Sequence, residues 1–400
     1  MRNKEYFVII VMGAILIKLL LFLLATVYVP QSKFLPDSSL YLKTADMLRM
    51  KGAFATQNTN GSLKYEINRT PGYPIFIALI NGVLKIPLGG IIFIQQLLII
   101  LVAGIVYKTA EAIEPKLKFL SAIIILYSPT LNIYSLMILT ETLFIFFISM
   151  FMFCYVQYLK NGEIKSLLLS SVMLVLASYV RPGCYFLGII MTFFIIYANA
   201  PKDTKKTLQH ALFFIFITYS SLGVWQLRNY QVAGVPVFSS IFFEDPIKNG
   251  LCHSFLRNTN HFKHHFRYDI GPVLYYMDAT WQSFWSFMSR PGSLKYFNCH
   301  ALTVIGKVFA YPFMIFWMIG FLWGIINTGR NIYYKFLLLV IVYFVSGSIL
   351  SDMLIATSRF RMPIMPYIAI ISAYGWIKLI SIFQKDKWYI FNIIDRKLKK

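Results

Sequence analysis

Long runs of apolar residues, separated by short polar and basic stretches, dominate the pattern along this 400-residue chain. A run of roughly 18 or more apolar residues can cross about 30 Å of hydrocarbon as a helix. Stretches such as Leu97 to Val106 are apolar on every side, whereas the strands of a membrane barrel alternate with a period of two. The pattern therefore predicts an all-α polytopic membrane protein.

About ten transmembrane helices are expected from these runs. The run 73–87 is only about 15 residues long, a length more typical of re-entrant or interfacial segments, so we predict that it is half-inserted. An interfacial helix is expected at 38–51, ending at Gly52. The predicted spans are residues 6–28, 91–110, 119–137, 142–159, 166–179, 184–198, 209–227, 301–326, 336–350 and 363–383.

The basic residues give a formal net charge of +22 and fall in short clusters between the apolar runs. With both termini in the cytoplasm these clusters are cytoplasmic, in accordance with the positive-inside rule. The first outer loop, 29–90, and the long loop 229–300 then lie on the non-cytoplasmic face. The transmembrane domain covers 1–383 and a basic cytoplasmic tail covers 384–400. No nucleic-acid-binding motif accompanies the charge, so no nucleic-acid partner is predicted.

The four cysteines do not have the spacing of metal ligands. Cys252 and Cys299 flank a segment of the long outer loop. The sequence allows either a disulfide between them or two free thiols. His261-x-x-His264-His265 lacks a nearby carboxylate or cysteine, so a solvated basic loop is favoured over a metal site.

Polar residues at the ends of the predicted spans collect on the non-cytoplasmic side. Only 16 residues of the chain are acidic, so the presence of two of them, Asp37 and Glu141, at this face is notable. Sugar transfer needs a carboxylate that takes the acceptor proton and cations that hold the departing phosphate, for which arginine suits well. Taken singly, such residues are more often caps, solvated loop residues or snorkelling anchors.

A set of motifs in a defined order favours a catalytic role for these residues. From about Pro36 to Gly375 the chain resembles the polyprenyl-phosphate-dependent glycosyltransferases of the GT-C fold, which include protein O-mannosyltransferases and lipid A aminoarabinose transferases. The motifs that carry the resemblance are Pro36-Asp37-Ser38-x-x-Tyr41, Arg69-Thr70-Pro71-Gly72-Tyr73-Pro74, Leu139-Thr140-Glu141-Thr142-Leu143-Phe144, Val180-Arg181-Pro182, Trp225-x-x-Arg228-Asn229-Tyr230-x-x-x-Gly234 and Ser358-Arg359-Phe360-Arg361-x-Pro363-x-x-Pro366.

The resemblance implies transfer of one sugar, with inversion, from a polyprenyl-phosphate carrier to a glycan, lipid or protein acceptor. It implies that Asp37 is the catalytic base and Glu141 the second acid of the site. Arg69, with Arg359 or Arg361, would bind the donor phosphate. The remaining candidates for substrate binding are Tyr73, Arg181, Trp225, Arg228 and Lys307.

Several points stay open at the level of the sequence. No metal site is predicted, although a divalent cation near Asp37 and Glu141 is an alternative. The long soluble C-terminal domain of some family members is not expected, and the loop 229–300 has no acceptor-recognition pattern. Compactness and the lack of organelle-retention signals favour a bacterial inner membrane.

The sequence admits three other functions. A transporter or flippase of lipid-linked glycans predicts charges deep within several spans and an internal repeat. Only Lys18 and Lys307 are candidates for such charges, and no repeat is found. A glycan polymerase or ligase with a diphosphate-linked donor, and a non-catalytic envelope subunit, also stay open.

Overall fold

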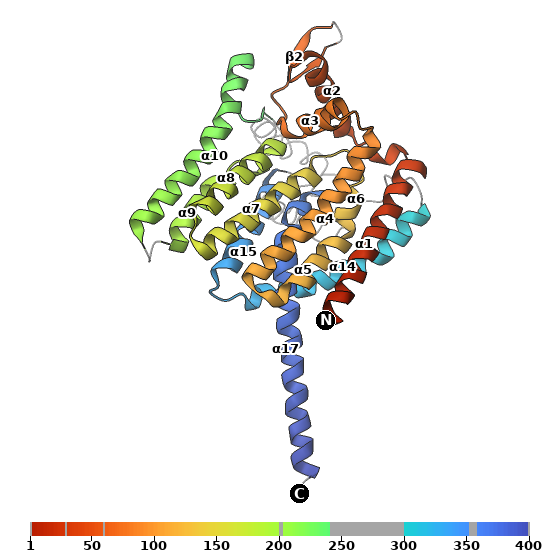
Figure 1. Cartoon of the computed structure of the whole chain (residues 1–400), viewed down its shortest axis with the longest axis vertical. Coiled ribbons are helices and arrows are strands. Elements are labelled where there is room, and N and C mark those ends of the chain that lie inside the picture. The colour runs from red at the N-terminus through yellow and green to blue at the C-terminus, as the bar shows by residue number, and fades with distance from the viewer. Residues whose placement is uncertain are drawn as a thin grey trace, which may run out of the picture.

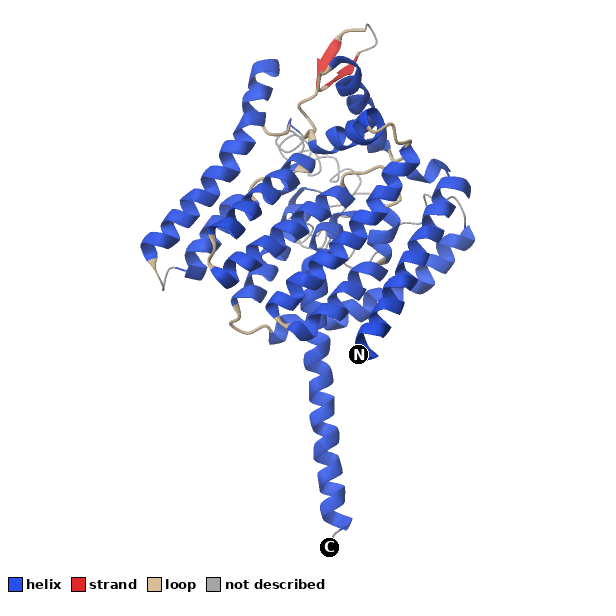
Figure 2. Ribbon diagram, viewed as in Figure 1, coloured by secondary structure: helices blue, strands red, loops and turns tan. Residues whose placement is uncertain are grey.

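A computed structural model describes residues 2–28, 30–58, 61–199, 203–240, 300–351 and 358–398 (Figures 1 and 2). The predictions for Cys252, Cys299 and the histidine-rich stretch lie outside these residues. The described part is almost wholly helical. Its helices are α1 (Arg2–Leu23), α2 (Pro36–Lys51), α3 (Gly72–Ile77), α4 (Leu88–Ile113), α5 (Lys118–Tyr127), α6 (Pro129–Tyr134), α7 (Glu141–Asn161), α8 (Ile164–Val180), α9 (Leu187–Asn199), α10 (Thr204–Ala233), α14 (His300–Asn327), α15 (Ile332–Ser351), α16 (Ser358–Arg361) and α17 (Met365–Leu398).

Within the described residues, seven helices are long and apolar enough to cross a membrane. They correspond to seven of the predicted spans, and the predicted spans 166–179 and 336–350 appear as shorter apolar helices. Figure 1 shows both termini at one end of the bundle, opposite to α2 and the β-hairpin. This arrangement agrees with the predicted placement of both termini on the same side.

The continuous span predicted at 119–137 is wrong, because this stretch breaks into α5 and α6. Proline at the first position of α6 has no N–H to continue the preceding helix. Ser128 has extended backbone and its side chain accepts from the Leu131 N–H, so it caps the new helix. A non-helical turn then leads from α6 to Glu141, at the start of α7.

The first outer loop is more ordered than predicted. The interfacial helix is present as α2, and Gly52 ends it in the left-handed conformation with φ of 63°. The polar stretch that follows forms an antiparallel hairpin of β1 (Ala55–Gln57) and β2 (Leu63–Tyr65). The predicted half-inserted run is a helix over Gly72–Val83. Its second half, Ala78–Val83, is a π-helix, so the segment rises less than the roughly 18 Å of a regular α-helix at about 1.5 Å per residue, too little to cross a bilayer.

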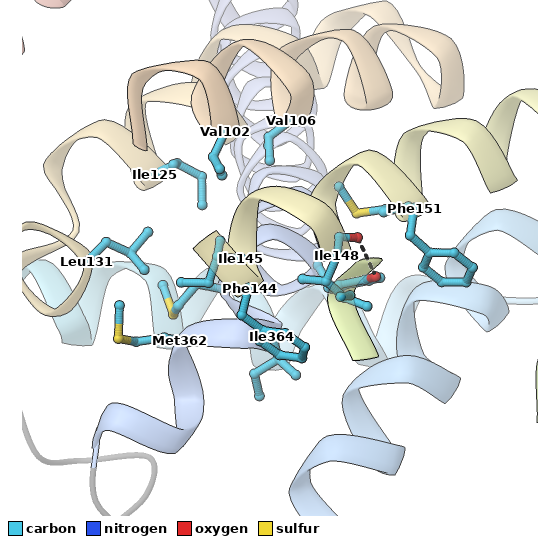
Figure 3. Packing of buried hydrophobic residues seen from close by; sticks show 14 of the residues in the cluster. Val102, Val106, Ile125, Leu131, Phe144, Ile145, Ile148, Phe151, Met362 and Ile364 are labelled. Atoms are coloured by element: carbon cyan, nitrogen blue, oxygen red, sulfur yellow. Dashed lines mark hydrogen bonds between the residues drawn. The ribbon is translucent and has the colours of Figure 1, made fainter. Parts of the chain in front are cut away.

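The hydrophobic core lies where α7 packs between its neighbours. Figure 3 shows Val102 and Val106 of α4 facing residues of α7 such as Ile145 and Ile148. Tyr367 of α17 donates its hydroxyl to the Ile148 carbonyl at 3.2 Å, which ties the last helix to this core. The segment that carries Arg359 leads into α17 and is thereby anchored against α7.

Glycines allow α14 and α17 to approach each other backbone to backbone. A Cβ atom at Gly375 would overlap the Gly320 carbonyl oxygen and the Gly324 nitrogen. Small residues four apart on one helix commonly make such crossings in membranes, where packing replaces the hydrophobic effect.

We expect Gly375→Ala to destabilise the fold by about 1–3 kcal/mol, because the added methyl meets backbone that cannot rotate away. Gly104→Ala in α4 is the matched control, since its Cβ would meet nothing within 4 Å. Thermal unfolding in detergent compares the two variants. An equal or higher unfolding temperature for Gly375→Ala would contradict the tight α14–α17 crossing.

Candidate active site

A cluster of two carboxylates and three arginines lies where α2, α7, α8 and α16 meet. The carboxylates are Asp37 and Glu141, and the arginines are Arg69, Arg181 and Arg359. These five residues come from five separate regions of the chain, and all five were predicted as site residues from the sequence. The fold therefore brings five of the ten predicted site residues into direct contact.

Asp37 lies in the first turn of α2, directly after Pro36. A helix N-terminus favours a negative charge, and proline is well suited to the first helical position. Arg69 Nη2 donates to Asp37 Oδ1 at 3.2 Å, and Arg359 Nη1 donates to Oδ2 at 3.1 Å. The Asp37 side chain is still 35% exposed, so a substrate could reach it.

Glu141 is the first residue of α7 and its side chain is 0% exposed. Arg181 Nη1 donates to Glu141 Oε1 at 2.6 Å, and Arg359 Nε donates to the same oxygen. Arg181 directly follows α8, where a cation interacts favourably with the helix C-terminus. Because Glu141 is buried between two guanidinium groups, it positions Arg181 and Arg359 and is not an exposed acid.

Arg359 joins the two halves of the cluster, because it pairs with both Asp37 and Glu141. Three guanidinium groups around two carboxylates leave one formal positive charge uncompensated within the cluster. The arrangement therefore favours an added anion over an added cation.

Arg69 is also held by Tyr41, one helical turn after Asp37. Arg69 Nη1 donates to the Tyr41 hydroxyl at 2.9 Å, and the guanidinium lies 4.8 Å from the centre of the Tyr41 ring. Burial raises the pKa of Tyr41, and the charge of Arg69 opposes that rise in part. Tyr41 is thus a neutral phenol that orients Arg69 toward Asp37.

The two carboxylate-bearing segments are joined by hydrogen bonds over a long stretch of sequence. Ser38 Oγ donates to the Ile138 carbonyl at 2.8 Å, and the Ile138 N–H donates to the Lys33 carbonyl at 2.9 Å. Sequence reasoning missed Ser38 as a contributor to the site. Its place directly after Asp37, inside the Pro-Asp-Ser motif, was the available signal.

A family model described as dolichyl-phosphate-mannose-protein mannosyltransferase matches residues 68–225. The archaeal oligosaccharyltransferase AglB from Archaeoglobus fulgidus, solved with an inhibitory peptide and a dolichol-phosphate, is 13% identical with a TM-score of 0.55. ArnT from Cupriavidus metallidurans, bound to undecaprenyl phosphate, is 14% identical with a TM-score of 0.52.

Both of these proteins are GT-C glycosyltransferases. The chain has the GT-C fold. It is an integral membrane protein. The match covers 98% of this chain and 52% of the AglB chain, and 91% of this chain and 59% of the ArnT chain. The chain thus spans between half and three-fifths of the length of these relatives. No curated protein sequence matches it.

Arg361, predicted as a phosphate ligand, occupies a different place in the GT-C fold from Arg359. Its Nη2 donates to Thr130 Oγ1 at 3.1 Å and its guanidinium lies 5.3 Å from the Trp317 ring centre. The side chain is buried beside a cavity of about 10 Å³. Among the described residues, the ion pairs of Asp37 and Glu141 involve Arg69, Arg181 and Arg359 and not Arg361.

Arg228 and Trp225 dock the first outer loop onto α10. Arg228 donates to the backbone carbonyls of Glu66, at 2.7 Å, and Phe54, at 2.8 Å, and its guanidinium stacks over the Trp225 ring. These contacts make both residues supports for the loop that carries Arg69, and their contact with substrate stays a prediction.

Tyr73 and Lys307, the other two candidates, lie at opposite extremes of exposure. Tyr73 is fully buried and its hydroxyl bonds to Gln95. Lys307 is exposed on α14. The burial of Tyr73 argues against its predicted contact with substrate.

The divalent cation left open by the sequence does not fit this donor set. The described residues contain no group of three or more histidine, cysteine or acidic side chains that could hold a metal. Asp37 and Glu141 each pair with two guanidinium groups, which would repel a divalent cation.

Proposed function

We propose that the protein is a membrane glycosyltransferase that moves one sugar from a polyprenyl-phosphate carrier to an acceptor on the non-cytoplasmic face. The acceptor is a glycan, lipid or protein that offers a hydroxyl or amine. The observation that carries this proposal is the contact between the accessible carboxylate of Asp37 and two members of a three-arginine cluster. The GT-C fold and the lipid phosphates named with both relatives support it.

In the proposed reaction Asp37 takes the proton of the acceptor as the acceptor oxygen or nitrogen attacks the anomeric carbon. The bond between that carbon and the phosphate oxygen breaks, and polyprenyl phosphate leaves with the electron pair. Attack from the face opposite to the phosphate inverts the anomeric centre. General base catalysis of this kind contributes about 10²–10⁴-fold to a rate.

The charges of the cluster suit both the bound donor and the departing phosphate. The uncompensated positive charge matches the single negative charge of a sugar phosphodiester. When Asp37 gains the acceptor proton, the cluster gains one more positive charge. The departing phosphate monoester gains one more negative charge at the same time, so the charge balance is kept in the transition state.

The donor phosphate is proposed to bind Arg69 and Arg359 in place of the Asp37 oxygens. Each oxygen of Asp37 accepts from one of these arginines in the structure. Transfer of both guanidinium groups to the phosphate would free the carboxylate to face the acceptor. Buried Glu141 keeps Arg181 and Arg359 in place during this exchange.

The orientation in the membrane is a separate prediction. In a variant with Cys252 and Cys299 replaced by serine, Lys64→Cys in β2 should react with a membrane-impermeant maleimide in intact spheroplasts. Lys205→Cys, near the start of α10 at the opposite end of the bundle, should react only after permeabilisation. Both lysines are exposed, so accessibility to reagent depends on the side of the membrane. The reverse labelling would place the cluster on the cytoplasmic face.

Transfer itself is tested with purified protein in nanodiscs, a polyprenyl-phosphate sugar and extracts of the native envelope as a source of acceptor. Release of polyprenyl phosphate together with a labelled product supports the proposal. A flippase or a non-catalytic subunit would move or bind the lipid without converting it.

A further inference from the structure

Gln95 in α4 links, through one buried amide, two segments that support opposite sides of the carboxylate–arginine cluster. Its side chain is 0% exposed. The Nε2 atom donates to the Ser135 carbonyl at 3.0 Å and to the Met137 carbonyl at 2.7 Å. The Oε1 atom accepts from the Tyr73 hydroxyl at 2.8 Å. Both amide hydrogens and the amide oxygen are therefore engaged.

The two hydrogen bonds from Gln95 Nε2 hold the turn that leads to Glu141. Residues 135–140 join α6 to α7 without forming a regular helix, so their backbone carbonyls need partners from elsewhere. Gln95 supplies two such partners, and Ser38 supplies a third at the Ile138 carbonyl. The position of the Glu141 carboxylate, and of the two arginines that it holds, depends on this turn.

The hydrogen bond from the Tyr73 hydroxyl to Gln95 Oε1 holds the side of the cluster that carries Arg69. Tyr73 follows Arg69 by four residues, and its ring packs edge-on against Tyr41 with 5.3 Å between ring centres. Tyr41 is the residue whose hydroxyl accepts from Arg69. Gln95 thus reaches Arg69 through Tyr73 and Tyr41.

We propose that Gln95 is a positioning residue for the phosphate-binding arginines, and that Tyr73 acts through it. Gln95 sets the separation between the Arg69 side and the Glu141 side of the cluster, so that Arg69 and Arg359 converge on one phosphate. This inference rests on the proposed function for its ligand, and on the three amide hydrogen bonds for its geometry.

The neighbouring glutamine provides a matched control. Gln96 is also buried in α4, but its Nε2 donates only to the Ser135 hydroxyl, at 2.8 Å, and its Oε1 has no hydrogen-bond partner among the described residues. Replacing either glutamine with methionine keeps the length and approximate volume of the side chain. Only Gln95→Met removes donors from the backbone of the Glu141 turn.

The experiment measures binding of undecaprenyl phosphate, without a sugar, to the full chain in nanodiscs. Gln95→Met should weaken binding by about tenfold or more, because two buried carbonyls lose their donors and the turn shifts. Gln96→Met should stay within about twofold of the parent. Tyr73→Phe should weaken binding by several-fold, and should have no further effect in the Gln95→Met background, as expected for residues that act through one contact.

Equal affinities for Gln95→Met and Gln96→Met would overturn the inference, as would additive effects of Gln95→Met and Tyr73→Phe. If Gln95→Met fails to fold, Tyr73→Phe against the parent decides, and unchanged affinity overturns the inference. If the parent protein does not bind undecaprenyl phosphate, the proposed function fails instead. Unfolding temperatures then decide on the positioning role: Gln95→Met and Glu141→Gln should be non-additive, while Gln96→Met and Glu141→Gln should add.

Discussion

Replacement of Asp37 with asparagine should lower the single-turnover rate of sugar transfer by about 10²–10⁴-fold, the range typical of a lost general base. Asparagine keeps the shape of the side chain but cannot accept the proton of the acceptor. Binding of undecaprenyl phosphate should be retained or become tighter, because Arg69 and Arg359 no longer pair with a carboxylate at this position. Single-turnover transfer and lipid-phosphate binding are measured on the same nanodisc preparation.

Asp46→Asn is the control for loss of one negative charge from α2. Asp46 pairs with Arg49 on the exposed side of the same helix, at 3.4 Å. Its replacement should change neither transfer nor binding by more than about twofold, since exposed ion pairs of this kind contribute little. If Asp37→Asn turns over like the parent, Asp37 is not the base of the reaction. That result would favour a protein that carries lipid-linked sugars without reacting them.

The second large effect is expected at Glu141. Glu141→Gln leaves Arg181 and Arg359 without their shared counter-charge, and breaking a buried ion pair in this way typically costs about 3–5 kcal/mol of unfolding free energy. Undecaprenyl phosphate should restore much of the lost thermal stability, because its phosphate supplies the missing negative charge to the arginines. The unfolding temperature is measured with and without the lipid.

Glu111→Gln offers a comparison with the same pairing pattern outside the site. Glu111 also pairs with two cations, Lys108 and Lys118, but its side chain is 32% exposed. Its loss should lower the unfolding temperature far less than Glu141→Gln does, because exposed ion pairs contribute little, and should show no added recovery with the lipid. A small effect at Glu141, or equal recovery in both variants, would show that the buried cluster does not receive the phosphate.

Much of the fold and the cluster could be predicted from the sequence, because both depend on strong local signals. Apolar run length identified seven helices that are long enough to span. The basic clusters were assigned to the cytoplasmic side, which placed the other polar span ends on the non-cytoplasmic side. Asp37, Glu141, Arg69, Arg181 and Arg359 lie at those span ends and were therefore proposed together. The GT-C resemblance, now shown for the fold, gave each of them a role that is still a proposal.

The rest depends on contacts between distant residues, which local patterns do not encode. Arg359 and Arg361 are two positions apart in one motif, yet one pairs with Asp37 and Glu141 while the other bonds to Thr130. Gln95 and Gln96 are adjacent in an apolar run, and local sequence does not show which of them supports the site, because the partners of Gln95 lie about 20 and 40 residues away. The break at Pro129 was missed because the apolar run continues through it.

Mass spectrometry of the lipids that copurify with Asp37→Asn from native membranes tests the central claim most directly. If Asp37 is the base of a transferase, this variant should retain its donor, and the spectrum should show a polyprenyl monophosphate that carries one sugar. The parent protein should convert that isolated lipid to polyprenyl phosphate when acceptor is added. Recovery of a diphosphate-linked glycan, or of no polyprenyl lipid, would contradict the account.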